Sequence, residues 1–433
     1  KKQGLEHCLH LKPLVNVKEK VAVIGSGISG LSAAYFLSKK YDVHLYEKNK
    51  RLGGHTRTLY VEDISKKIPI DTGFIVFNEK NYPDLTKFFQ TLKINCRDSD
   101  MSFAVSNKIP NVEYSGKTFF SLFSNFKNIF SLRFYKMIFE INRLYSICDK
   151  LEINNKNSKK TLDEFLNENK FSNYLKNYHI LPMISSIWSS NSEKAKQFPL
   201  KSFIEFFSNH GLFNIISRPQ WKYIKNGSSS YIKELINKNM FSYETNFKIK
   251  TIKRENDNIE ILSDNKTYKF DKLVLATHAD QALSLIDKPT IEEKNILSIF
   301  KYSKNLAVLH SDEKHMPQRK LSWSSWNFIK RSESDNFSLT YWMNKLQNLQ
   351  SKKNYFVTIN PTKLPENVID QTFFEHPIFS LETLKAQKKL YKIQGKKNTY
   401  FCGSYFGYGF HEDGIQSAAN LCKYLDVELP WKR

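Results

Sequence analysis

The stretch from Val21 to Glu47 constrains the fold more than any other part of the chain. It begins with a short apolar run suited to a buried strand, and Gly25, Gly27 and Gly30 follow at GxGxxG spacing before a helical pattern. The first glycine permits a tight turn, the second lets backbone N–H groups approach a pyrophosphate, and the third lets the helix pack close to the strand. A second strand ends at Glu47, whose carboxylate can accept the hydroxyl hydrogens of an adenosine ribose. This order of elements predicts a dinucleotide site.

Residues 21–38 carry no charge and are long enough to be counted as a membrane span. Three glycines and four serines within them would make a poor lipid-facing helix, so a strand, a turn and a helix are favoured. Residues 1–20 contain no apolar core of signal-peptide length and are expected to be a polar lead-in to the first strand.

The length of 433 residues exceeds the usual size of one domain, so two domains or one fold with an inserted domain are expected. The net charge of +23 favours an anionic partner, which could be nucleic acid, an anionic membrane surface or an anionic substrate. Since Lys and Asn are abundant everywhere rather than clustered, a solvated basic surface explains the charge equally well. The charge therefore leaves both interpretations open.

The cysteines are odd in number and share no CxxC or metal-like spacing. They are Cys8, Cys96, Cys148, Cys402 and Cys422. This pattern indicates neither a disulfide framework nor a zinc site, and no metal is expected. A reduced, cytoplasmic setting fits it best.

The residues directly after Glu47, KNKRLGGHT (48–56), extend the site. A Gly-Gly pair beside Arg51 gives a second close backbone approach to a cofactor that reaches beyond the pyrophosphate. Here the chain begins to resemble the flavin amine oxidase superfamily, which includes monoamine oxidases, phytoene desaturases and protoporphyrinogen oxidases. That superfamily has a Rossmann fingerprint, then an acid, then an Arg-x-Gly-Gly element.

The resemblance continues in order along the chain. The matching segments are 71–73 (DTG), 226–228 (NGS) before a helix, Ile249 in a basic strand, 273–278 (LVLATH), and 400–404 with 412–418 at the closing strand and helix. His278 stands where the superfamily has a glycine. The resemblance implies that FAD is the cofactor.

The resemblance and the glycine spacing together assign the cofactor-binding residues. They are Gly25, Gly27, Ile28, Ser29, Gly30, Glu47, Lys48, Arg51, Gly53, Gly54, His55, Thr56, Thr72, Gly73, Phe74, Ile249, Ala276, Thr277, His278, Gly403, Ser404, Asp413, Gly414, Ile415 and Ser417.

The expected fold class is α/β, with a Rossmann-type (glutathione reductase-like) FAD-binding domain, an interleaved α+β substrate domain and a helical cap. After the lead-in, the FAD-binding domain is expected to comprise 21–74, 232–290 and 391–433, and the substrate domain 75–231 and 291–390.

A narrower resemblance also involves the substrate segments. The matching runs are DTGFIVFNEKNYP (71–83), SDMSFAVS (99–106), LPMISSIW (181–188), NHGL (209–212), RPQW (218–221), YWMNKLQ (341–347) and YGFHEDG (408–414). They look like a bacterial subgroup of NAD/FAD-binding proteins whose relatives are associated with cyclopropane fatty acid synthase-like methyltransferases. This resemblance implies modified fatty acyl chains of phospholipids as substrate, and such a methyltransferase as a functional partner.

Residues 117–150 combine aromatic and basic side chains. Apolar residues recur at helical spacing at Phe119, Phe123, Phe126 and Phe130, then at Phe134, Ile138, Ile141 and Tyr145. Lys117, Lys127, Arg133, Lys136, Arg143 and Lys150 are interspersed, against only Glu140 and Asp149. The segment is either a basic amphipathic helix lying on anionic lipid or an ordinary cap helix that covers the core.

In a flavin enzyme the cofactor carries the redox step, and the protein places a substrate C–H over the ring in a dry pocket. A protein base is therefore not obligatory. Candidate pocket residues are Trp188, His210, Trp323, Trp326, Tyr341, Trp342, Tyr405, Tyr408 and His411. Among them, His411, Tyr408, Trp188, Tyr341 and Trp326 are the catalytic candidates, and structural packing is the alternative role of each.

The chain departs from the superfamily at two points. The cysteine that tethers flavin in monoamine oxidases lies before the closing strand, and no Cys occurs here between 149 and 401, so noncovalent FAD is expected. No Lys in 300–350 matches by motif the water-bridging lysine of amine oxidases, which puts an amine substrate in doubt.

The leading functional hypothesis is an FAD oxidoreductase that dehydrogenates or isomerises an unsaturated or methylated acyl chain in membrane phospholipid. Such a protein is expected in the cytoplasm, peripheral on the inner face of the membrane. The alternatives are a soluble amine or heterocycle oxidase, and a basic protein that keeps FAD as a structural or sensory ligand. Nucleic-acid binding explains the charge but none of the motifs, so no nucleic-acid partner is expected.

Overall fold

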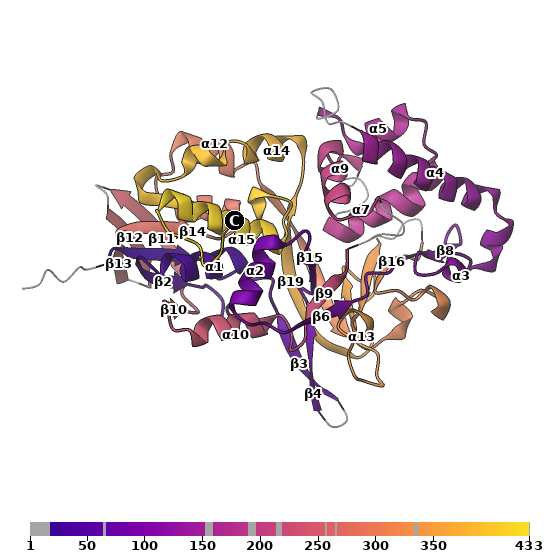
Figure 1. Cartoon of the computed structure of the whole chain (residues 1–433), viewed down its shortest axis with the longest axis horizontal. Helices are drawn as coiled ribbons and strands as arrows, with labels where there is room; N and C mark the ends of the chain where they lie inside the picture. The colour runs from indigo at the N-terminus through magenta and orange to yellow at the C-terminus, as the bar shows by residue number, and fades with distance from the viewer. Residues whose placement is uncertain are drawn as a thin grey trace, which may run out of the picture.

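The computed structural model describes residues 18–63, 66–151, 159–188, 196–213, 219–255, 258–264, 266–332 and 337–432. Residues 1–17, most of the expected lead-in, lie outside these ranges. The parallel sheet built on the glycine motif lies at one end of the molecule and the helical cap at the other, with a second sheet between them (Figure 1). None of the helices in these ranges combines the length and the apolar character needed to cross a bilayer.

A parallel sheet with strand order β10-β2-β1-β14-β20 forms the first domain. Its strands are β1 (Lys20–Ile24), β2 (Asp42–Tyr46), β10 (Ser242–Glu244), β14 (Lys272–Leu275) and β20 (Thr399–Phe401). β1 pairs in parallel with both β2 and β14. Its successive side chains point to opposite faces: Val21 and Val23 join one hydrophobic cluster, whereas Ala22 and Ile24 join another. An all-apolar strand is therefore stable here because both faces of the sheet are covered.

The first cluster packs against helices and the second mainly against a small antiparallel sheet with further helices. The first contains α1 (Ile28–Leu37), α2 (Pro83–Thr91), α10 (Ser229–Asn237) and α15 (His411–Tyr424). The second contains β11 (Ile249–Glu255), β12 (Asn258–Ser263), β13 (Lys266–Phe270), α11 (Ala279–Leu285), α12 (Ile291–Leu297), α14 (Leu381–Gln387) and the 3₁₀ helix η6 (Leu390–Ile393).

The packing of three helices differs from the expected division of the chain. The expected substrate domain included α2 in its first segment, 75–231, and α12 and α14 in its second segment, 291–390. The structure packs Phe88 of α2 in the first cluster, and Leu297 of α12 and Ala386 of α14 in the second. Domain boundaries drawn from motifs do not predict this packing, because the motifs mark where the chain meets the ligand and not which hydrophobic core a helix covers.

The second sheet is mixed and has the strand order β19-β15-β18-β17-β16-β7-β8. Its strands are β7 (Phe103–Asn107), β8 (Val112–Ser115), β15 (Lys301–His310), β16 (Trp326–Lys330), β17 (Ser338–Trp342), β18 (Phe356–Ile359) and β19 (Val368–Ile378). Only the β7–β16 pair within this sheet is parallel among the described strands. The long β15 and β19 run between the two domains (Figure 1).

Short elements connect these layers. They are the hairpin β3 (Thr58–Asp63) with β4 (Lys66–Asp71), the antiparallel sheet β5 (Val76–Asn78), β9 (Trp221–Ile224) and β6 (Cys96–Ser99), the helix α13 (Met343–Leu346), and the 3₁₀ turns η4 (Glu313–His315), η5 (Lys320–Ser322), η7 (Lys396–Asn398) and η8 (Ser404–Phe406).

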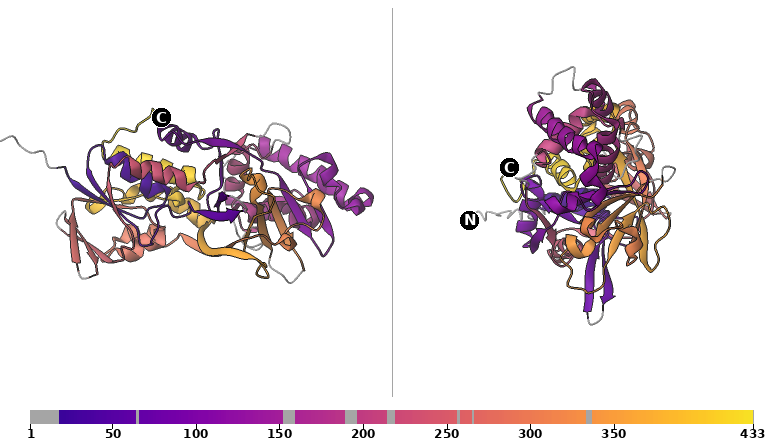
Figure 2. Two further views of the ribbon diagram at one scale, coloured as in Figure 1. Left: turned by 90° about the horizontal axis from the view of Figure 1, so that it is seen from below. Right: turned by 90° about the vertical axis from the view of Figure 1, so that its right-hand side faces the viewer.

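The cap has its own aromatic core, to which Phe134, Phe203 and Phe207 contribute fully buried rings. Its elements are α3 (Phe119–Leu122), the 3₁₀ helix η1 (Phe126–Phe130), α4 (Leu132–Lys150), α5 (Leu162–Glu168), α6 (Asn173–Leu175), the π-helical turn η3 (Lys176–Ile180), α7 (Leu181–Trp188) and α9 (Leu200–Asn209). Figure 2 shows α4 extending to the end of the molecule farthest from the parallel sheet.

The apolar face expected along 117–150 is divided in the structure. Its later part turns inward, since Phe134 and Tyr145 are buried in the cap core. Its earlier part does not, because Phe119, Phe126 and Phe130 are exposed. A single helix through the whole segment is therefore wrong: α3, η1 and α4 are separate, and Ser131 caps α4 by accepting from Phe134 N.

Candidate functional site

A cavity of about 1050 Å³ lies between the parallel sheet, the second sheet and the cap. Gly25 follows β1, Glu47 follows β2 and Ala276 follows β14, and all three residues line it. The crevice beyond the carboxyl ends of parallel strands is where open α/β sheets bind their ligands. The cavity is therefore the candidate site.

The turn from β1 to α1 presents backbone to the cavity. A Cβ added at Gly27 would meet nothing within 4 Å, whereas one at Gly30 would overlap with the carbonyl oxygen of Gly25. Gly30 thus permits the helix to pack on the strand. Gly27 leaves open space beside the N-terminus of α1, where free N–H groups and the helix dipole favour a phosphate. This open space fits the pyrophosphate of a dinucleotide.

Glu47 is buried at the end of β2, and donors fix its carboxylate. Its Oε2 accepts hydrogen bonds from Ser26 N at 3.0 Å and Ser26 Oγ at 2.6 Å. Its Oε1 accepts from Asn49 N at 2.9 Å and Asn49 Nδ2 at 2.7 Å. Sequence reasoning missed both partners, although Ser26 lies inside the glycine motif and Asn49 two residues after the acid.

Arg51 and the following glycines form a second turn against the first. Gly53 N donates to Ser26 O at 3.0 Å, and Arg51 Nη2 donates to Gly54 O at 2.7 Å. A Cβ at Gly54 would lie 3.1 Å from Gly27 Cα. The two turns therefore border the same part of the cavity, as expected for a cofactor that extends past the first glycine loop.

The closing helix α15 also approaches the first turn. A Cβ at Gly414 would lie 2.7 Å from Ile28 Cγ2, so the two helices meet at a glycine. Gly403 N donates to Ser417 Oγ at 2.9 Å, which joins the end of β20 to α15. Burial raises the pKa of Asp413, in the first turn of α15, to about 7.

Most residues expected to bind the cofactor border the cavity. These are Gly25, Gly27, Ile28, Ser29, Glu47, Lys48, Arg51, Gly54, His55, Gly73, Phe74, Ile249, Ala276, Thr277, His278, Gly403 and Ser404. The remainder lie behind its lining: Gly30, Gly53, Thr56, Thr72, Asp413, Gly414, Ile415 and Ser417. The residues of this second group shape the turns and helix contacts that support the lining.

Histidines from separate parts of the chain border the cavity. They include His55, His278, His376 and His411. Burial lowers the pKa of His376 to about 4 and that of His411 to about 3. Burial also lowers the pKa of His55 and of His278, although nearby Glu375 opposes the shift of His278. These rings are therefore neutral near pH 7.

His411 is held on the cofactor side of the cavity. Its ring stacks on Phe74 with centroids 3.8 Å apart, and its Nε2 lies 3.0 Å from Thr56 Oγ1. Thr56 Oγ1 in turn lies 2.7 Å from Tyr231 OH. A neutral ring fixed in this way can position a neighbouring group and exclude water.

Tyr408 and Trp188 join the cofactor side to the cap. Tyr408 OH donates to Glu205 of α9, and Trp188 Nε1 donates to the Tyr408 carbonyl oxygen at 3.3 Å. Burial and the Glu205 carboxylate raise the pKa of Tyr408. Its proton is therefore firmly held, and both residues line the cavity as part of its wall.

Trp326 and Tyr341 border the cavity from neighbouring strands β16 and β17. Their rings meet edge to face with centroids 4.7 Å apart. Burial raises the pKa of Tyr341, and Trp326 Nε1 is buried without a hydrogen-bond partner among the described residues. The pair therefore forms an aromatic wall of the cavity.

The remaining pocket candidates separate into two groups. His210 and Tyr405 line the cavity. Trp323 and Trp342 do not: they pack edge to face, 5.5 Å between centroids, in a small cluster elsewhere in the second sheet. The prediction that these two tryptophans border the pocket is therefore wrong.

Sequence reasoning also missed part of the lining. The missed residues include Met101, Phe103, Met183, Ile187, Leu212, Tyr302, Lys304, Phe373, Phe374, Glu375 and His376. The segment 373–377 carries no motif, and only the pairing of β19 with β15 brings it to the cavity.

Cysteine placement bears on how a flavin would be held. Cys402 is buried directly after β20, and burial raises the pKa of its thiol. None of the described cysteines borders the cavity, and Cys8 lies outside the described residues. The described part of the chain therefore offers no thiol for a covalent link, and noncovalent binding remains the prediction.

Comparisons with known proteins agree with this geometry. Residues 23–92 match the NAD(P)-binding Rossmann-like domain family, and no curated protein matches the chain. A CLA-producing fatty acid isomerase from P. acnes shares the fold at 14% identity and a TM-score of 0.69, covering 94% of this chain and 99% of that one. Cyclohexylamine oxidase from Brevibacterium oxydans IH-35A shares the fold at 13% identity and a TM-score of 0.67, covering 94% of this chain and 100% of that one. Putrescine oxidase bound to putrescine shares it at 13% identity and a TM-score of 0.64, covering 95% of this chain and 99% of that one. The predicted fold class is confirmed: residues 23–92 match a Rossmann-like dinucleotide-binding domain, and the chain as a whole shares its fold with this isomerase and these amine oxidases.

Proposed function

We propose that this protein is an FAD-dependent oxidoreductase that acts on an unsaturated or methylated fatty acyl chain, by desaturation or by double-bond isomerisation. The observation that supports it best is the separation of charge within the cavity. The charged Asp, Glu, Lys and Arg residues of the lining are Glu47, Lys48, Arg51, Lys248, Lys304 and Glu375. These lie on or beside the cofactor domain and the β15–β19 pair.

The opposite end of the cavity is lined by the cap and by the strands β7, β16 and β17. Its residues include Met101, Phe103, Met183, Ile187, Trp188, Phe206, Leu212, Trp326 and Tyr341. Among the described lining residues, this end contributes no Asp, Glu, Lys or Arg. A hydrocarbon chain gains free energy on leaving water for such a wall, whereas a charged group is strongly disfavoured there without a partner.

An amine or heterocycle oxidase remains the alternative, since amine oxidases share the fold. The residues that line the cavity favour an amine substrate less than an acyl chain. A protonated amine at the apolar end would lack a carboxylate partner among the described residues that line that end. The isomerase from P. acnes, which by its name acts on a fatty acid, shares the same fold and supports the acyl substrate.

Bound FAD would supply a ring that exchanges hydride with a C–H of the substrate. The chain's own residues would do the rest. The open turn at Gly27, the carboxylate of Glu47 and the Arg51 turn would hold the dinucleotide. The aromatic walls around Trp188 and Trp326 would orient the chain and exclude water. The histidines of the cavity are neutral near pH 7 and only weakly basic, and hydride transfer to a flavin does not oblige the protein to supply a base.

The expected association with a cyclopropane fatty acid synthase-like methyltransferase is part of this proposal. The resemblance that suggests this partner implies modified fatty acyl chains of phospholipids, the class of substrate proposed here. The cytoplasmic location is proposed with it, because phospholipid acyl chains would then be reached from the inner membrane face.

The test is to incubate the FAD-loaded protein with free fatty acids and phospholipids of defined acyl content and to read the chains by mass spectrometry. Moved double bonds without an electron acceptor would establish isomerisation. Loss of two hydrogens coupled to reduction of oxygen or a quinone would establish desaturation. Unchanged chains, together with release of peroxide from small amines, would overturn the proposal in favour of the amine oxidase.

A substitution at Phe103 sharpens this test. Phe103 lines the apolar end of the cavity from β7. We expect Phe103→Asp to lower acyl turnover at least about tenfold, because a carboxylate there disfavours hydrocarbon, while flavin content stays unchanged. The matched control Phe103→Leu should keep most of the activity. Equal acyl turnover by both variants would contradict the proposed position of the chain.

A further inference from the structure

The start of the cap carries a cluster of exposed apolar side chains, here called the aromatic face. Its exposed fractions are Phe119 72%, Phe120 76%, Phe126 63%, Ile129 46%, Phe130 79%, Leu132 86%, Tyr135 45% and Phe139 68%. These residues come from α3, η1 and the first half of α4, within 21 positions of one another. Single exposed apolar residues are common, but large rings gathered on one face mark a surface that binds something.

The polar residues of the same segment lie underneath. Ser121, Asn125 and Asn128 are buried and hydrogen-bonded. Ser121 Oγ donates to Ser115 O at 2.9 Å, and Asn128 Nδ2 donates to Glu113 O at 3.0 Å. This arrangement is the reverse of a water-soluble surface helix, which buries apolar side chains and exposes polar ones. The exposure therefore does not come from a loosely placed loop.

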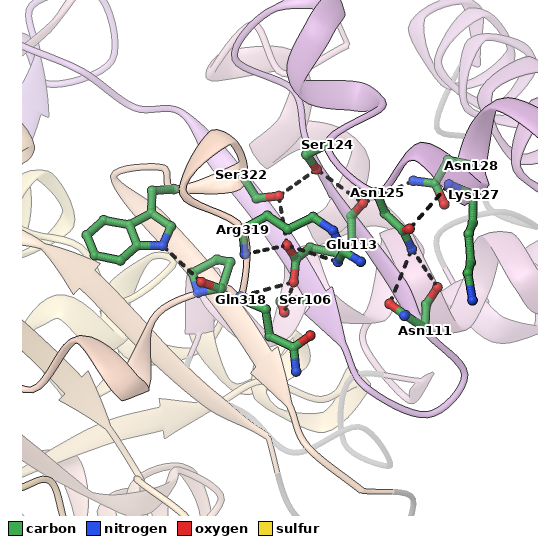
Figure 3. Close-up of polar contacts among 12 residues, drawn as sticks. Ser106, Asn111, Glu113, Ser124, Asn125, Lys127, Asn128, Gln318, Arg319 and Ser322 are labelled. Atoms are coloured by element: carbon green, nitrogen blue, oxygen red, sulfur yellow. Dashed lines mark hydrogen bonds and ion pairs between the residues drawn. The ribbon is translucent and has the colours of Figure 1, made fainter.

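A polar network fixes this segment to the second sheet, as Figure 3 shows. At its centre, the buried Glu113 of β8 accepts from Ser106 Oγ at 2.8 Å and from Arg319 N at 2.9 Å. Ser322 Oγ lies 2.5 Å from Ser124 Oγ, which joins the network to the turn between α3 and η1. The aromatic face is thus held outward by satisfied hydrogen bonds below it.

The charges around the aromatic face have one sign. Lys117, Lys127, Arg133 and Lys136 are exposed among its rings, and residues 114–139 contain no Asp or Glu. The nearest carboxylates in sequence, Glu113 and Glu140, are both buried. Basic side chains interleaved with exposed rings are the composition of surfaces that lie in the interface of an anionic bilayer.

We propose that the aromatic face is a membrane-docking surface that inserts its rings into the interface of a bilayer containing anionic lipid, with its Lys and Arg side chains on the lipid headgroups. The aromatic face lies at the cap end of the molecule, away from the parallel sheet (Figures 1 and 2). Docking through it leaves the dinucleotide-binding domain in water. The inference goes beyond the proposed function, which concerns the cavity, and does not require it.

The test is co-sedimentation of the full-length FAD-loaded protein with vesicles of phosphatidylcholine alone or mixed with phosphatidylglycerol. We expect binding to the mixed vesicles that weakens at high salt. A triple variant that combines Phe120→Ser, Phe130→Ser and Leu132→Ser should bind the mixed vesicles at least about tenfold more weakly, because each of these side chains contributes apolar area to the contact. A second triple variant combines Lys127→Gln, Arg133→Gln and Lys136→Gln. Its affinity for vesicles should fall about fivefold for each charge removed, and only when the vesicles contain anionic lipid.

The matched control is Ile291→Ser, Leu364→Ser, Tyr391→Ser, at positions exposed to 76%, 64% and 63% and outside the aromatic face. It removes a comparable apolar area and should bind as the unchanged protein does. Equal binding by the aromatic-face variant and this control would overturn the inference, and so would absence of binding to anionic vesicles. Dissociation of a lipid-free oligomer by the aromatic-face variant would overturn it too, since the occupant would then be a second copy of the chain.

Turnover of dispersed free fatty acid separates this inference from the proposed function. The aromatic-face residues do not line the cavity, so their variants should keep that turnover. Vesicle binding without any acyl turnover would count against the proposed reaction alone.

Discussion

Gly27 and Gly30 differ in their surroundings, although both belong to one motif. Gly27 faces open space, and Gly30 touches the backbone of Gly25. The motif therefore combines a position kept for a ligand with a position kept for the fold. Within the same motif, Ser26 borders the cavity and also holds the Glu47 carboxylate.

This contrast predicts different outcomes for two similar substitutions. Gly30→Ala should lower the melting temperature of the flavin-free protein, because its methyl group overlaps with the Gly25 carbonyl. Gly27→Ala should leave that temperature unchanged and reduce FAD affinity at least about tenfold, since it fills the space left for phosphate. Thermal unfolding without flavin and FAD titration measure the two effects. Full FAD affinity in Gly27→Ala would refute the position assigned to the pyrophosphate.

At the level of elements, Asp71 joins three parts of the chain that are far apart in sequence. At the end of β4, it accepts hydrogen bonds from Thr58 Oγ1 at 2.5 Å, Ser228 N at 2.9 Å and Gln347 Nε2 at 2.8 Å. These partners belong to the β3–β4 hairpin, the start of α10 and the end of α13. The DTG segment, which sequence analysis associates with the flavin, thus also has a structural role. Burial raises the pKa of Asp71 to about 6.

Asp71→Ala should lower the free energy of unfolding by about 1–3 kcal/mol, because it leaves buried donors without acceptors. Urea unfolding monitored by circular dichroism measures this change. Glu62→Ala is the matched control, since Glu62 forms an exposed ion pair with Lys67 on the same hairpin and should matter little. Equal effects of the two substitutions would show that the Asp71 junction does not stabilise the molecule.

For the whole molecule, buried neutral histidines make stability depend on pH. His310 is fully buried on β15, away from the cavity, and its Nε2 lies 2.7 Å from Thr358 Oγ1. Burial, followed by the nearby His315, lowers its pKa from 6.5 to about 3. The unfolded chain therefore binds a proton below pH 6.5 that the folded chain excludes. The resulting contribution to stability is present above pH 6.5 and is lost as the pH falls toward 3.

His310→Gln removes this titration. Relative to the variant, the unchanged protein should lose about 1 kcal/mol of unfolding free energy for each pH unit below 6.5. Urea unfolding at pH 7.5, about 6 and about 5 gives the difference. A difference that stays constant with pH would mean that His310 is protonated in the folded protein.

Local patterns in the sequence were enough to predict the dinucleotide-binding domain. The turn at Gly25, Gly27 and Gly30, with its flanking strands, depends on contacts between neighbouring residues and on backbone geometry, which a short motif specifies. The second glycine turn and the start of the closing helix α15 are likewise specified by short motifs. For that reason the α/β fold class was predictable, and most of the expected cofactor residues border the cavity.

Part of the cavity lining and the aromatic face were decided by tertiary structure. His376 and Phe374 reach the cavity only through the pairing of β19 with β15, which no local pattern encodes. In the segment 117–150, helical spacing did not distinguish Phe134, which is buried, from Phe130, which is exposed. That difference arises because the Glu113 network holds the polar side of η1 inward. Sequence thus determined the local turns that meet the cofactor, whereas long-range packing decided which side chains face the substrate and which face the solvent.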